Sequence, residues 1–142
     1  MTKLVIDASA AASWLLASQA TAPALALLDR LDDFEPVAPH VFHWEIGNLL
    51  VRQTRREATF DLAEALSVLA AFKIAAAPPV GRDEVFRLAR FAAAKGLSLF
   101  DCGYLWLAMA VDGGLASRDG GLLAAARAAG LPVFDLREPT PA

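Results

Sequence analysis

Two short apolar runs in this chain lead into an aspartate at the start of a helical segment. Leu4-Val5-Ile6 is followed directly by Asp7, and Leu115-Ala116-Ser117 is followed one residue later by Asp119. Short buried strands that alternate with helices predict a parallel sheet covered on both faces. The carboxyl ends of parallel strands meet at one edge of the sheet, so we expect Asp7 and Asp119 to share one crevice.

Helical patterns, with apolar residues spaced near one turn, fill most of the remaining chain. The helices expected after the one that Asp7 opens are Ala22 to Leu31, His40 to Arg56, Phe60 to Phe72, Asp83 to Lys95, Ser98 to Val111 and Gly121 to Ala129. Glu35 to Pro39 is expected to be a brief extended segment, and Pro132 to Leu136 a last strand. The predicted class is α/β, with a short-stranded central parallel sheet flanked by helices.

The length of 142 residues suits one domain spanning residues 1–142, with a frayed tail at 137–142 marked by Pro139 and Pro141. Apolar residues make up 56% of the chain and charged residues only 20%, so some apolar surface is expected to face a partner. The net charge of −3 argues against broad nucleic-acid binding through a basic surface. It leaves room for a nuclease whose acidic site holds cations.

The location expected from the sequence is cytoplasmic. The uncharged stretch from Ala8 to Leu28 contains polar residues and Pro23, which disfavours a membrane-spanning helix. Only three apolar residues precede Asp7, which is too few for a secretory signal. The single Cys102 cannot form an internal disulfide, and no nucleophile motif surrounds it.

Four of the 16 acidic residues lie in apolar or glycine-rich surroundings, and these are Asp7, Glu45, Asp101 and Asp119. Helix capping, or for the glutamate the helix dipole, is one explanation. The other is metal binding, because a carboxylate among apolar residues is costly unless it is paired, hydrogen-bonded or bound to a metal. No comparable set of Lys or Arg stands in these segments, and Mg²⁺ prefers a few carboxylates together with water and phosphate oxygens. The set of four therefore favours a divalent cation site.

Other side chains have two interpretations each. Arg52, Arg55 and Arg56 either grip RNA phosphates or form an exposed helix face. His40 and His43, with Glu45, have the spacing of a transition-metal site, but histidines near a helix start are more often packing or capping residues. The three tryptophans either stack on RNA bases or, as their apolar neighbours favour, pack in the core or an interface; they are Trp14, Trp44 and Trp106.

Four segments in order resemble the motifs of PIN domains, over roughly residues 3 to 135. Val5-Ile6-Asp7-Ala8-Ser9 is similar to the first, and Trp44-Glu45-Ile46-Gly47-Asn48-Leu49-Leu50 to the second. Leu99-Phe100-Asp101-Cys102-Gly103-Tyr104-Leu105-Trp106-Leu107-Ala108 resembles the third, and Leu115-Ala116-Ser117-Arg118-Asp119-Gly120-Gly121-Leu122 the fourth. Cys102-Gly103 departs from the family, which commonly has Ala after the third Asp.

The resemblance, which extends to the VapC toxins of toxin-antitoxin pairs, implies a PIN-like fold and an Mg²⁺- or Mn²⁺-dependent endoribonuclease. The ligand roles carry over to Asp7, Glu45, Asp101 and Asp119. Ser9 and Ser117 match positions that position an outer-shell water, and Asn48 is placed to orient Glu45. The implied partners are RNA, a VapB-type antitoxin and a second copy of the chain, with contact surface expected near Trp44 and residues 60–72.

Two rival functions follow from the same residues. A phosphatase or a receiver domain on another α/β fold would also place an acid where Asp7 stands. A phosphatase of this kind needs a second Asp where Ser9 stands, and a receiver domain needs paired acids near the start and a later Lys. This chain has neither pattern. A catalytically silent PIN-fold interaction module is the other rival, and the presence of all four acids speaks against it.

Overall fold

The computed structural model describes residues 1–138. Residues 139–142, which include both prolines of the tail expected to fray, lie outside the described residues. Arg137 is ordered by two side-chain hydrogen bonds to Asp135. Among residues 1–138, no helix combines the length and the apolar character that crossing a bilayer requires.

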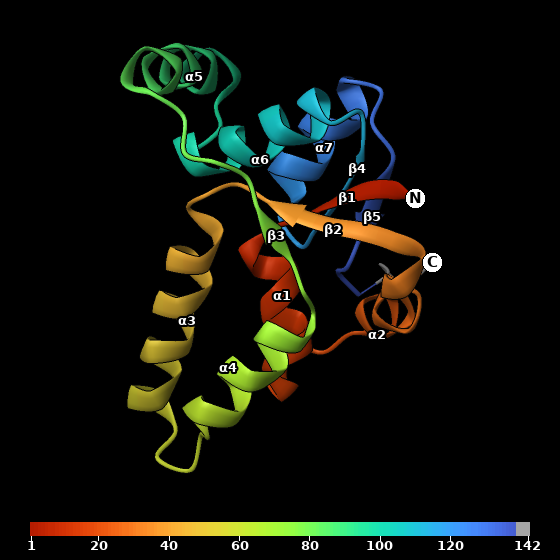
Figure 1. The fold of residues 1–142 in the computed structure, drawn as a ribbon, viewed down its shortest axis with the longest axis vertical. Helices are drawn as coiled ribbons and strands as arrows, with labels where there is room; N and C mark the ends of the chain where they lie inside the picture. Colours follow the sequence, from red (N-terminus) through yellow and green to blue (C-terminus); the bar gives the residue numbers. More distant parts are fainter. Residues whose placement is uncertain (139–142) are drawn as a thin grey trace.

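The centre of the molecule is a five-stranded sheet in which every neighbouring pair is parallel, with strand order β3-β2-β1-β4-β5 (Figure 1). The strands are β1 (Thr2–Ile6), β2 (Phe34–Ala38), β3 (Ala75–Ala76), β4 (Gly114–Ser117) and β5 (Val133–Asp135). The α/β class with a short-stranded parallel sheet is thus confirmed. Because β1 and β4 are neighbours, the two segments that end in aspartates lie side by side.

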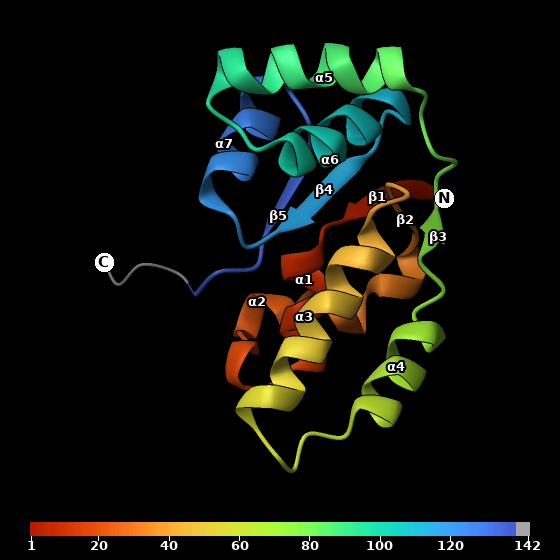
Figure 2. The same cartoon turned by 90° about the vertical axis from the view of Figure 1, so that its left-hand side faces the viewer.

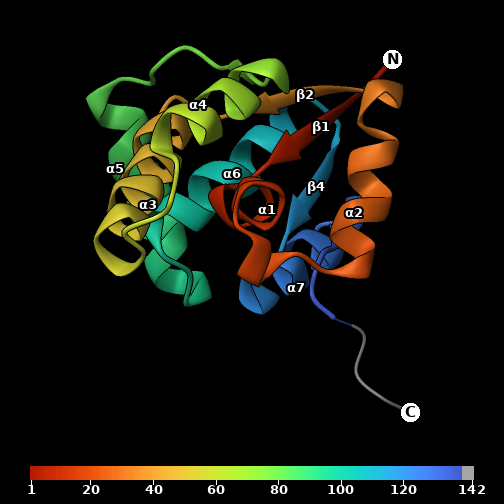
Figure 3. The same ribbon diagram turned by 90° about the horizontal axis from the view of Figure 1, so that it is seen from below.

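Among residues 1–138, seven α-helices cover the sheet. They are α1 (Ala8–Leu15), α2 (Ala22–Asp29), α3 (Phe42–Arg56), α4 (Leu62–Ala71), α5 (Arg82–Lys95), α6 (Leu99–Ala110) and α7 (Gly120–Ala128), with short 3₁₀ turns η1 (Ala17–Gln19) and η2 (Leu31–Asp33). Helices α5, α6 and α7 lie on one side of the sheet, and α1, α2 and α4 on the other (Figures 1 and 2). Seen from below, α1 is end-on near the centre of the molecule (Figure 3). Both faces of the sheet are therefore covered, as parallel sheets require.

Several elements differ from the sequence-based expectation. The segment expected to be briefly extended is a full strand, β2, and β3 was not expected because two alanines carry no pattern. Residues His40 and Val41 form a turn before α3. Helix α4 begins only after Asp61, whose carboxylate accepts a hydrogen bond from the backbone N–H of Glu64. The other helices begin and end within two residues of the expected positions.

Helix α6 runs through the core and carries the largest buried side chain, Tyr104. Its neighbour Cys102 is buried against α5, with its Sγ donating to the carbonyl of Leu88 at 3.5 Å. Burial raises the pKa of this thiol. The position where the chain departs from the PIN pattern therefore serves packing, and a reactive thiolate is disfavoured.

Candidate metal centre

The four candidate acids all lie in the first turn of a helix or at its cap. Asp7 caps α1 and Asp119 caps α7, directly after the neighbouring strands β1 and β4. Glu45 lies in the first turn of α3 and Asp101 in the first turn of α6. Asp101 is not a cap, because Ser98 accepts the hydrogen bond from its backbone N–H at 3.0 Å. The positive ends of four helix dipoles thus each face a carboxylate.

Asp7 is the most enclosed of the four, with only 4% of its surface exposed. Its Oδ1 accepts from Ser9 Oγ at 2.7 Å and from the Ala10 backbone N–H at 2.8 Å, and its Oδ2 accepts from Ser117 Oγ at 2.5 Å. Burial raises its pKa to about 6, although these hydrogen bonds act in the opposite direction. The hydrogen bonds therefore fix the direction of the carboxylate, while burial disfavours its charged form.

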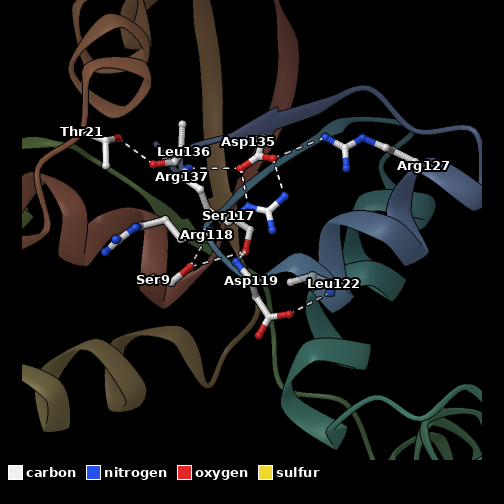
Figure 4. A network of polar contacts seen from close by, with 10 residues as sticks. All are labelled: Ser9, Thr21, Ser117, Arg118, Asp119, Leu122, Arg127, Asp135, Leu136 and Arg137. Carbon is white, nitrogen blue, oxygen red and sulfur yellow. Dashed lines mark hydrogen bonds and ion pairs between the residues drawn. The ribbon is translucent and has the colours of Figure 1, made fainter. Parts of the chain in front are cut away.

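The two serines link the first acid to the fourth. Ser117 Oγ also accepts from the backbone N–H of Asp119 at 2.9 Å, while Ser9 Oγ accepts from the backbone N–H of Arg118 at 2.8 Å (Figure 4). Both serines bond directly to Asp7, and they tie the end of β4 to the start of α1; their role in positioning a water stays a prediction. Their hydroxyls fix the relative positions of the two capping aspartates.

Glu45 is oriented by Tyr104, a residue that the sequence analysis did not single out. The buried hydroxyl of Tyr104 donates to Glu45 Oε1 at 2.8 Å. Burial and the charge of Glu45 raise the pKa of Tyr104, so the hydroxyl keeps its proton and remains a donor. The available signal was spacing, because Tyr104 is three residues after Asp101 and so lies on the same side of the helix.

Asp101 connects the four acids electrostatically. Burial raises its pKa, and the charge of Asp119 raises it further. The charge of Asp101 in turn raises the pKa of Glu45, after the larger effect of burial, and also that of Asp7. The structure therefore places Asp101 close enough to each of the other three sequence-predicted acids to repel it.

No Lys or Arg forms an ion pair with the four acids within residues 1–138, although the charge of Arg137 interacts with that of Asp119 at longer range. In the same residues, no three His, Cys, Asp or Glu side chains lie close enough together to hold a metal ion as they stand. The chemistry of the donor set nevertheless fits a hard divalent cation, since all four side chains offer oxygen ligands and repel one another. A cation would relieve that repulsion, whereas a soft metal would find neither thiolate nor imidazole among the four.

The expected helper on α3, Asn48, is exposed and makes no hydrogen bond to Glu45 in the described part of the chain. The hydrogen bond that holds Glu45 comes from Tyr104, and an orienting role for Asn48 stays a prediction. Asn48 and Arg52 do line the same shallow groove as Glu45. Arg55 and Arg56 lie about three turns beyond Glu45, roughly 15 Å along the helix. Of the three arginines, only Arg52 therefore stands at the site.

The two histidines and three tryptophans that the sequence left open differ in burial and packing. His40 and His43 are exposed and form no cluster with Glu45 that could hold a metal, as far as the described residues extend. Trp14 donates its Nε1–H to the carbonyl of Ala24 at 2.8 Å and packs edge-on against Phe72, so it is a packing residue. Trp106 packs against the core clusters. Trp44, by contrast, is exposed.

A second polar cluster, formed by Arg127, Asp135 and Arg137, lies near the C-terminal end of the described chain (Figure 4). Arg137 donates from Nε and Nη2 to the two carboxylate oxygens of Asp135, and Arg127 lies 3.6 Å from the same carboxylate. The bonds from Arg137 lower the pKa of Asp135 to about 2. A Cβ at Gly120 would stand 2.7 Å from Arg137 Nη1, so glycine at this position leaves room for the guanidinium beside Asp119.

A family model described as the PIN domain matches residues 4–128, which is most of the chain. No curated protein sequence matches it.

Solved structures share the fold. A structure described as PAE2754 from Pyrobaculum aerophilum is 23% identical with a TM-score of 0.68, over 94% of this chain and 90% of that one. FitAcB from Neisseria gonorrhoeae is 18% identical with a TM-score of 0.57, over 93% and 96%. A domain of a functionally unknown protein from Methanocaldococcus jannaschii is 16% identical with a TM-score of 0.55, over 100% and 96%. At these identities the likeness concerns the fold alone.

Proposed function

The chain belongs to the PIN domain family, and from that premise we propose that it is an endoribonuclease that uses Mg²⁺ or Mn²⁺ to cleave RNA phosphodiester bonds. PIN domains are generally nucleases, and membership removes the phosphatase and receiver-domain alternatives, which need other folds. The observation that carries the proposal is a group of four carboxylates, linked by repulsion through Asp101, that form no ion pair with Lys or Arg among residues 1–138; they are Asp7, Glu45, Asp101 and Asp119.

In this proposal the four acids hold the cation, which lowers the pKa of water and stabilises charge on the phosphate. The chain itself supplies orientation. Ser9 and Ser117 hold both oxygens of Asp7, and Tyr104 holds one oxygen of Glu45. The other Glu45 oxygen makes no hydrogen bond to residues 1–138, which leaves it available as a ligand. The substrate phosphate is expected at the same edge of the sheet.

The test is cleavage of single-stranded RNA with Mg²⁺, with Mn²⁺ and with a chelator. Asp119→Asn is expected to abolish cleavage, because it removes a charged ligand and retains the cap. The matched control is Asp61→Asn, since Asp61 caps α4 with the same hydrogen bond to the third residue of its helix and does not belong to the group of four acids. Equal loss in both variants, or full activity of Asp119→Asn, refutes the proposed ligand role. A wild-type chain that cleaves nothing supports the silent interaction module.

We propose further that the enzyme is a toxin of the VapC type with a VapB-type antitoxin as its partner. An apolar groove of about 300 Å³ lies between α6 and the segment that joins β3 to α5, and its lining includes Pro79, Val80, Leu99 and Phe100. It suits the apolar face of a short helix. Phe100 immediately precedes Asp101, so a basic side chain at the end of such a helix would meet the four acids.

Arginine is the expected basic residue, because its planar fork can bond two carboxylate oxygens and its charge competes with the metal. The test uses the protein encoded by the adjacent reading frame, with that arginine replaced by alanine. Inhibition of RNA cleavage should be lost while the complex persists. If inhibition is unchanged, occlusion alone explains it and the charge competition is wrong.

A further inference from the structure

Trp44 lies on the surface of α3 with 78% of its area exposed, although the same helix buries Phe42, Ile46 and Leu50. Among the large apolar side chains of the described residues, only Met1, at 81%, is more exposed. The other two tryptophans of the chain are packed against neighbours. The exposure of Trp44 is therefore not explained by the fold.

Trp44 and Phe100 line one shallow groove of about 370 Å³, which we call the aromatic groove. Its other lining residues are Val41, Glu45, Asn48 and Arg52. Phe100, 52% exposed, extends from the start of α6 and directly precedes Asp101. The groove thus contains one candidate metal ligand and adjoins a second.

We propose that the aromatic groove binds an unpaired base of the RNA beside the phosphodiester that is cleaved, with the base stacked on Trp44. The proposal rests on the ribonuclease function and adds a substrate subsite to it. Every base offers a π-face to an aromatic ring, and the Asn48 amide offers both a donor and an acceptor to a base edge. Arg52 supplies a positive charge for a neighbouring phosphate.

The polar lining favours RNA over a protein partner or a second copy of the chain. An apolar protein surface on this groove would bury Glu45, Asn48 and Arg52 without partners, which is costly. An RNA strand meets the amide and the guanidinium with hydrogen-bonding groups and brings phosphate to the acids and their cation. The apolar groove between α6 and the segment that joins β3 to α5 has an almost wholly apolar lining and is better suited to bind a protein helix.

Two substitutions separate stacking from simple apolar contact. Trp44→Leu keeps an apolar side chain and removes the π-face, whereas Trp44→Phe keeps a smaller π-face. The matched control is Phe86→Leu on α5, where the side chain is 54% exposed and lines neither groove. Binding of a fluorescein-labelled single-stranded RNA is measured by anisotropy in the Asp119→Asn background with Mg²⁺. Inorganic polyphosphate, a polyanion without bases, is the second probe.

Trp44→Leu is expected to weaken RNA binding roughly 5- to 100-fold, as the loss of one stacked base does. Trp44→Phe should recover most of that loss, and Phe86→Leu should change nothing. Polyphosphate should bind all four proteins equally, because the charge is untouched. In the cleavage-competent protein, the loss in Trp44→Leu should appear mainly in KM.

Four results overturn the proposal, and a fifth separates it from the nuclease function. RNA binding by Trp44→Leu as tight as by the parent protein rules out stacking, and an equal loss of polyphosphate binding points to general damage. Conversion of a dimer into a monomer by Trp44→Leu, seen by light scattering, identifies the groove as an interface between copies. RNA binding that depends on Trp44 in a chain that never cleaves RNA refutes the nuclease function but retains the base site. Absence of any RNA binding refutes both.

Discussion

Replacing Asp7 with asparagine should stabilise the metal-free protein in a manner that depends on pH. Burial raises the pKa of this carboxyl from 3.8 to about 6. The folded state therefore holds the proton more strongly than the unfolded state, and the free energy of unfolding falls as pH rises through this range. A difference of about two pKa units corresponds to about 3 kcal/mol at pH 7.

From pH 4 to pH 7, the free energy of unfolding of Asp7→Asn should thus rise relative to that of the wild type by up to about 3 kcal/mol. Any constant offset reflects the hydrogen bonds that asparagine remakes with Ser9 and Ser117. The assay is denaturant unfolding in a chelator, with Asp61→Asn as the exposed capping control. A difference between variant and wild type that does not change with pH refutes the reasoning. The same variant should lose metal-dependent RNA cleavage, measured with folded protein.

Three further outcomes are expected. Millimolar Mg²⁺ or Mn²⁺ should raise the melting temperature of the wild type, because the cation relieves the repulsion among the carboxylates. For the same reason, Asp101→Asn should raise the melting temperature of the metal-free protein. A melting curve that metal does not change, together with no binding by calorimetry, refutes the shared site. Tyr104→Phe should weaken Mn²⁺ binding about tenfold by freeing Glu45, as measured by calorimetry, whereas Thr54→Val, which removes an exposed hydroxyl on α3, should not. The chain should be a homodimer, in part through apolar residues of α4 such as Leu66 and Val68, and light scattering that shows only a 15.0 kDa species contradicts this.

The positions of the acids were predictable because they depend on local patterns. An apolar run followed by Asp7 or Asp119 defines a strand end and a helix cap at once, and the parallel sheet places two such ends together. The apolar character of α6 likewise predicted a central helix, and it is buried. These features need only the spacing of neighbouring residues.

Contacts between distant segments could not be predicted in the same way. Tyr104 and Glu45 are 59 residues apart, and their hydrogen bond depends on how α3 packs near α6. Spacing alone suggested Asn48 as the partner of Glu45, but an exposed position on α3 leaves its side chain directed at the groove. Strand β3 is similar, because Ala75 and Ala76 are a strand only through their pairing with β2.

Capping and metal binding, which compete as explanations of an aspartate in the sequence, are compatible in the structure. Asp119 uses Oδ1 to accept the backbone N–H of Leu122 at 2.9 Å, while its Oδ2 makes no hydrogen bond to residues 1–138. A cap fixes the direction of the carboxylate through one oxygen and leaves the other for a ligand role. At Asp7 the serines add further constraints and offset part of the cost of the buried charge, but burial still raises the pKa of this carboxyl to about 6. Because a cation would recover that cost, the local preference that starts each helix also prepares the site for a metal.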